Sequence, residues 1–107
     1  MAHPSRSWNA METTDLIGSE YTLSVTGEVQ TLGTNEHAKL AVAHPQGIVA
    51  QELILTLTIE KDSGTAGHVV QWTPVEYQHK ISSQQYHSVR IRGDVDDQMV
   101  KVERALS

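Results

Sequence analysis

The stretch Gln51–Glu60, with the sequence QELILTLTIE, decides the fold class. Its odd positions from 53 to 59 all carry large aliphatic side chains, whereas the even positions carry one isoleucine and two threonines. Apolar residues at every second position, with β-branched residues between them, predict a β-strand with one face in a hydrophobic core. Both faces suit neighbours in a sheet, so we expect an interior strand and not an edge strand or a helix.

Length and composition predict one domain that folds without covalent help. The chain has 107 residues, and a domain of this size buries roughly two thirds of the surface that its unfolded chain exposes. Phenylalanine is absent, so aliphatic residues, tryptophan and tyrosine must form the core. Cysteine is also absent, which excludes disulfides, thiol catalysis and cysteine-based zinc sites.

The charge pattern argues against nucleic acid and membrane as partners. The net charge is −5, and the eight lysines and arginines are spread along the chain, whereas phosphate binding needs them clustered. Arg90 and Arg92 alternate on one expected strand, but three aspartates follow them at positions 94, 96 and 97. No apolar stretch approaches the roughly 18 residues of a membrane-spanning helix.

The N-terminal segment is polar and has no periodicity. We expect residues 1–15 to form a disordered tail and residues 16–107 to form a single β-rich domain. Trp8 is then a loose tail residue or, alternatively, an anchor that docks on the domain. The segment has no charged region followed by an apolar run, so no secretory signal is expected and a cytoplasmic location is the default.

Further strands are expected on both sides of the central stretch. Tyr21–Thr26 alternates, and residues 29–32 extend this strand past a bulge or turn at Gly27 and Glu28. Residues 37–44 fit a strand, or an alanine-rich helix that ends before Pro45, and we favour the strand. Turns are expected at residues 44–47 and 61–67.

Two later segments have competing signals. Thr73–Glu76 matches a helical capping box with proline at the first position, but residues 75–82 alternate without a break, which favours a strand. Residues 87–92 also alternate. The C-terminal segment 95–106 fits either a helix or a strand, and we favour a strand over residues 98–104.

The fold class that follows is all-β. We expect about seven short, mostly antiparallel strands in a small sandwich or barrel. The alternative is an α+β fold in which the C-terminus or residues 35–43 form a helix on the sheet.

Two histidines are the best candidates for a site. If residues 75–81 and 87–92 form an antiparallel hairpin with a five-residue loop, His79 lies opposite Val89 and Ile81 lies opposite His87. The two histidines are then diagonal neighbours, with β-carbons roughly 7 Å apart. Tyr77 lies on the same face, and together they predict a pocket for a ligand. The alternative is that both histidines lie at the rim and bond to backbone or water.

Other motifs give weaker signals. Trp72 is a candidate for stacking on a ligand, or else part of the core. No metal site is expected, because no H-x-H or H-E-x-x-H spacing occurs, and the aspartates after Gly93 lack the closing glutamate of a calcium loop. Arg92-Gly93-Asp94 spells the tripeptide of integrin ligands, but glycine followed by an acid is ordinary turn chemistry. No nucleophile motif or phosphate-binding loop occurs, so neither catalytic residues nor a cofactor is expected.

The segment Gly18-Ser19-Glu20-Tyr21 at the start of a strand, with Arg104 near the end of the chain, resembles the lipocalin-like barrels. Those proteins carry Gly-x-Trp at this point, which this chain lacks, and the chain is short for eight strands. The resemblance assigns no family. It implies only that a ligand cavity inside a barrel is worth considering.

The sequence therefore leaves two functional hypotheses. The first is a non-enzymatic domain that binds a protein partner or assembles with itself through a sheet face or edge. The second is a small barrel with a ligand-binding or catalytic pocket around Tyr77, His79 and His87. We favour the first, because it requires no catalytic motif.

Overall fold

The part of the protein that the structure describes is built from seven strands. The computed structural model describes residues 3–14, 20–33, 35–43, 51–61, 67, 69–81 and 85–106. The strands are β1 (Ser5–Thr14), β2 (Tyr21–Thr31), β3 (Glu36–Val42), β4 (Glu52–Lys61), β5 (Gln71–Ile81), β6 (Ser88–Gly93) and β7 (Gln98–Leu106). No helix occurs in these ranges, so the all-β prediction is confirmed.

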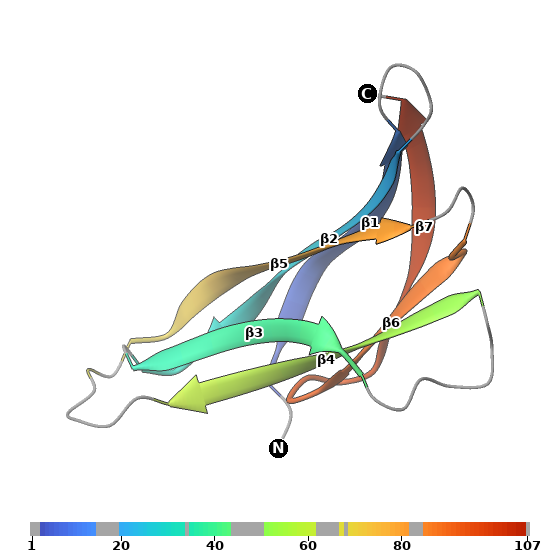
Figure 1. Ribbon diagram of the computed structural model, residues 1–107. Coiled ribbons are helices and arrows are strands. Elements are labelled where there is room, and N and C mark those ends of the chain that lie inside the picture. Colours follow the sequence, from blue (N-terminus) through green and yellow to red (C-terminus); the bar gives the residue numbers. More distant parts are fainter. Residues whose placement is uncertain are drawn as a thin grey trace.

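The seven strands form one mixed sheet in the order β3-β4-β6-β7-β1-β2-β5. Four neighbouring pairs are antiparallel, whereas β4 pairs with β6 and β1 pairs with β7 in parallel. The sheet curls until its two outermost strands, β3 and β5, pack near each other (Figure 1). The fold is therefore a nearly closed barrel and not a sandwich of two sheets.

The core lies inside this barrel, and each of the seven strands contributes to it. β4 is an interior strand, as predicted, with β3 on one side and β6 on the other. The buried apolar side chains that form the core are Ala10, Leu23, Val25, Val29, Leu40, Leu53, Leu55, Leu57, Val75, Val89, Ile91, Val95 and Val102. Their cross-strand partners face the same side of the sheet, so the register also tells which polar residues face inward.

The prediction of a disordered tail is wrong for Ser5–Thr14, because these residues form β1 between β7 and β2. Two residues of β1, Ser7 and Trp8, lie opposite the single residue Gly27 of β2. This β-bulge shifts the alternation by one, so that the inward-facing positions have no constant spacing along the strand. Trp8 packs against the core, as the anchor alternative required.

The contested segments are strands. Residues 36–42 form β3, the stretch around Thr73–Glu76 lies within β5, and residues 98–106 form β7, so the strand predictions are confirmed there. The bulge expected at Gly27 lies instead in β1, opposite that glycine. Most of the turns expected at residues 44–47 and 61–67 lies outside the described residues.

Candidate functional site

The structure separates the two histidines that the sequence placed together. β5 pairs with β2, and β6 lies between β4 and β7, so the predicted β5–β6 hairpin is wrong. His87 is exposed just before β6, where its backbone N–H donates to the Gln51 carbonyl at 2.8 Å. β5 and β6 have different neighbours in the sheet, and the spacing of residues 75–92 could not reveal these long-range partners.

Tyr77 and His79, by contrast, do lie together. The Tyr77 hydroxyl and Nδ1 of His79 are 3.1 Å apart, and the two rings stack at 17°. Burial, and to a smaller extent nearby Tyr86, raise the pKa of Tyr77 above its ordinary value of 10.0. The protonated phenol and Nδ1 of His79 share one hydrogen bond, and the tautomer of the imidazole decides which of the two groups donates.

A buried carboxylate lies in the same row of side chains. Glu12 of β1 is partnered by Arg104 of β7 on one side and by Leu23 of β2 on the other, and Leu23 is partnered by His79. These four residues share the inward face, because cross-strand partners point the same way. Glu12 is 4% exposed and lies 3.6 Å from the Arg104 guanidinium.

The sequence does not single out Glu12 as a site residue, because its segment lacks the period-two alternation that predicts a strand. The only signal for Arg104 was its position near the end of the chain. Together with Tyr77 and His79, these residues place polar side chains on the inward face of β1, β2, β5 and β7, where the Arg104 guanidinium lies beside the Glu12 carboxylate. Polar groups of this kind can orient a ligand.

Trp72 faces outward, on the opposite side of the sheet from Tyr77 and His79. The Arg6 guanidinium stacks on its ring, 3.9 Å from the centroid, and Arg6 also pairs with Glu28 at 3.1 Å. Stacking between an arginine and an indole fixes both side chains. Trp72 is therefore a half-exposed surface residue and not a core residue.

Exposed apolar side chains gather beside Trp72. Leu32 follows the last residue of β2, and Val69 and Val70 precede β5, next to the final cross-strand pair Thr31↔Gln71. Their exposed fractions are 53%, 42% and 66%. Three of the four exposed large hydrophobic residues in the described part of the chain thus lie at one end of β2 and β5. We call Leu32, Val69, Val70 and Trp72 the outer patch.

A cleft opens in the sheet between β1 and β7. The two strands pair only from Ala10↔Val102 onward. Nearer the N-terminus, an isolated β-bridge pairs His3, before β1, with Val95, before β7. Between these points lies a hollow of about 410 Å³. Its lining residues are Ser5, Arg6, Ser7, Trp8, Asn9, Gln98, Met99, Val100, Lys101 and Glu103.

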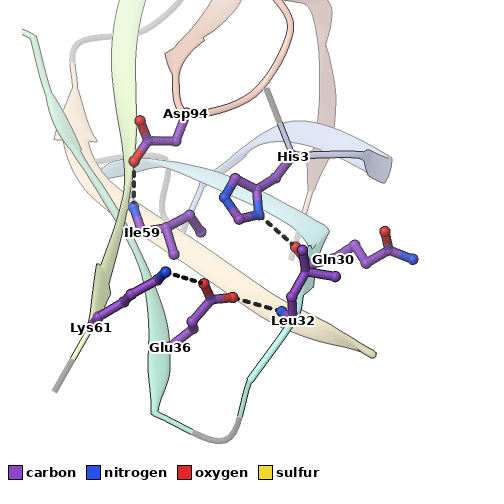
Figure 2. A network of polar contacts seen from close by, with 7 residues as sticks. All are labelled: His3, Gln30, Leu32, Glu36, Ile59, Lys61 and Asp94. Carbon is purple, nitrogen blue, oxygen red and sulfur yellow. Dashed lines mark hydrogen bonds and ion pairs between the residues drawn. The ribbon is translucent and has the colours of Figure 1, made fainter. Parts of the chain in front are cut away.

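Polar contacts hold the end of the barrel where β1 begins (Figure 2). His3 bonds through Nδ1 to the Gln30 carbonyl at 3.0 Å, and its backbone N–H donates to the Asp94 carbonyl at 2.7 Å. The Asp94 carboxylate accepts from the Ile59 N–H at 2.7 Å. Asp94 therefore ties the chain's N-terminal segment to β4, which gives the Arg92-Gly93-Asp94 tripeptide a structural role.

The same end contains a buried glutamate that caps a turn. The Glu36 carboxylate accepts from the Leu32 N–H at 2.6 Å, while its second oxygen lies 3.7 Å from the Lys61 ammonium (Figure 2). A buried carboxylate needs such partners, because an unpaired one is costly. The carboxylates of Glu36 and Asp94 thus both have hydrogen-bond donors within the fold.

The charged loop after β6 is also internally paired. Arg90 bonds to Glu52 at 3.0 Å, and Asp97 lies within 3.7 Å of the guanidinium groups of both Arg90 and Arg92. Within the described ranges, no group of three or more histidine, aspartate or glutamate side chains is arranged to hold a metal ion. Nor does any described segment form a helix long and apolar enough to cross a membrane.

Comparisons of the chain with protein-family models, with curated proteins and with solved structures found no match. The functional argument therefore depends on the geometry of the chain itself.

Proposed function

We propose that the protein is a non-enzymatic binding module that recognises a protein partner, or a second copy of itself, through the outer patch. The observation that carries this proposal is the gathering of exposed Leu32, Val69 and Val70 beside Trp72. Apolar side chains that meet at one place on a surface are a common feature of interaction sites, whereas singly scattered ones are not.

The composition of the patch supports a protein as the partner. Tryptophan and arginine are the residues most often found at the energetic centre of interfaces, and here Arg6 stacks on Trp72. Aliphatic residues on one side and the Arg6–Glu28 ion pair on the other give an apolar centre with a charged rim. A cytoplasmic setting, expected from the sequence, is part of this proposal.

Replacing Val70 with glutamate tests the proposal, because it puts a charge at the centre of the patch. Gln78→Glu is the matched control, since it adds the same charge to the outward side of β5, away from the patch. Sedimentation of both variants and the wild type measures self-association, and affinity capture followed by mass spectrometry identifies heterologous partners. We expect Val70→Glu, and not Gln78→Glu, to abolish the association. The proposal would be refuted if the wild-type protein stays monomeric and if Val70→Glu captures the same proteins as the wild type.

A second candidate function is the binding of a small anionic ligand by the inward-facing row. The hydrogen bond between Tyr77 and His79, and the guanidinium of Arg104 in the same row, favour it. His87 is not part of this site. A ligand found by NMR screening should shift the His79 ring signals in the wild type, and His79→Gln should lose the binding of that ligand. His87→Gln should bind like the wild type, and equal loss of binding in both variants would contradict this assignment.

A further inference from the structure

We propose that the cleft between β1 and β7 is a second binding site, which takes an extended peptide segment by pairing with the free edge of β7. None of the four residues of the outer patch lines this cleft, although Arg6 borders both, and the proposal does not depend on the patch. The proposal rests on three features of the cleft, namely unpaired backbone groups, a strained bulge that opens it, and the chemistry of its walls.

Two residues of β7, Met99 and Lys101, direct their backbone N–H and C=O groups away from β6 and toward β1. The Val102 N–H donates to the His87 carbonyl at 2.9 Å. In an antiparallel ladder, every second residue of a strand directs its N–H and C=O to the same neighbour. Gln98, Val100 and Val102 therefore face β6 in the observed register, and Met99 and Lys101 face the other way.

None of the described strands pairs with these groups. Pairing of β7 with β1 begins at Ala10↔Val102, so the N–H and C=O of Met99 and the N–H of Lys101 have no ladder partner among the described residues. An exposed strand edge is a template for an added strand, and β-strand addition is a common way to bind extended peptides.

The bulge in β1 is what keeps the cleft open. Ser7 has a φ of 60°, in the left-handed region that residues other than glycine rarely adopt. It lies where β1 departs from β7, because Ser7 and Trp8 together oppose Gly27 of β2. Without this extra residue, the alternation of β1 would continue and its pairing with β7 would extend further. Such bulges are common next to binding sites, where they end the pairing of a strand.

The walls of the cleft suit a peptide. Trp8 and Val100 are half-buried and pack against the core, so they form an apolar floor. Met99, Lys101 and Glu103 are exposed at the rim. Lys101 and Glu103 make no ion pair within the described part of the chain, so both charges are available to a ligand. Main-chain pairing would give affinity, and contacts with the floor and rim would give sequence preference.

Peptides selected from a random heptapeptide library against the full-length protein provide the probe. We expect selected peptides to shift the backbone amide NMR signals of Met99 and Lys101 and to slow hydrogen exchange there. N-methylation of the peptide's central amides should weaken binding about tenfold or more, because it removes backbone donors without changing the protein.

Met99→Pro provides the matching change on the protein. It removes an N–H that points into the cleft and leaves the β6–β7 ladder intact, since proline is tolerated where a strand edge is free. We expect this variant to keep the wild-type unfolding midpoint and to lose peptide binding, whereas Val70→Glu should bind peptide as the wild type does.

Three results would overturn the proposal. The first is slow exchange of the Met99 and Lys101 amides in the free protein, which would mean that the edge is already paired. The second is peptide binding that resists N-methylation. The third is a set of selected peptides that are lost with Val70→Glu and retained by Met99→Pro, which would support the outer patch and exclude the cleft.

Discussion

The indole of Trp8 lies directly over Gly27, in the space that a side chain at that position would occupy. A Cβ built on Gly27 would stand 2.6 Å from Cδ2 of Trp8. The glycine is thus required for packing, since it faces the bulge that lets the tryptophan reach the core. One contact joins the start of β1 to the middle of β2.

Replacing Gly27 with alanine should lower the free energy of unfolding by about 1–3 kcal/mol, because the ring must move out of a packed position. Urea unfolding followed by tryptophan fluorescence measures this loss. In Trp8→Ala the space is empty, so the double variant should lose less than the sum of the two single losses. Strict additivity would contradict the contact.

Replacing Ser7 with glycine should stabilise the protein. A left-handed backbone costs a residue other than glycine about 1–2 kcal/mol, which glycine avoids. Part of this stabilisation is lost, because glycine increases the conformational entropy of the unfolded chain. We therefore expect Ser7→Gly to raise the free energy of unfolding by less than about 1 kcal/mol. Ser7→Val should lower it, since β-branched residues tolerate this conformation least. Thermal unfolding of the two variants measures both effects, and a destabilised Ser7→Gly would show that the serine side chain makes its own contribution.

Asp94 should contribute to the stability of the fold through its hydrogen bond with Ile59. Asp94→Ala leaves the partly buried Ile59 N–H without its acceptor, which should cost about 1–3 kcal/mol of unfolding free energy. Asp94→Asn keeps an acceptor oxygen and should lose less. Asp96→Ala, at an exposed position of the same loop, is the control in urea unfolding. If Asp94→Ala loses no more unfolding free energy than Asp96→Ala, the Asp94 carboxylate does not stabilise the fold by accepting from the Ile59 N–H.

Tyr77 should ionise at a higher pH than an ordinary tyrosine. Its pKa is raised above 10.0 by burial and by Tyr86, so the folded state favours the neutral phenol. The stability that Tyr77 contributes is therefore fully present below about pH 10 and decreases as the pH rises through its folded pKa. Ultraviolet titration of tyrosine ionisation should lose its highest-pH component in Tyr77→Phe and keep it in Tyr21→Phe. Retention of that component in Tyr77→Phe would refute the assignment.

The sequence by itself determined the strands whose alternation is unbroken. β4, β5 and most of β2 were predictable, because each presents apolar side chains to one face at every second residue. The pairing of Tyr77 with His79 was predictable for the same reason, since residues two apart in a strand share a face. Alternation is a local property, and local sequence contains it.

Only the tertiary structure decided which strands became neighbours. β1 escaped prediction because its bulge breaks the alternation and its inward positions carry Ala10 and the charged Glu12. His87 was misplaced because β6 pairs in parallel with β4 and not with β5. Strand partners depend on burying a shared core between segments far apart in the chain, and no short window of sequence records that choice.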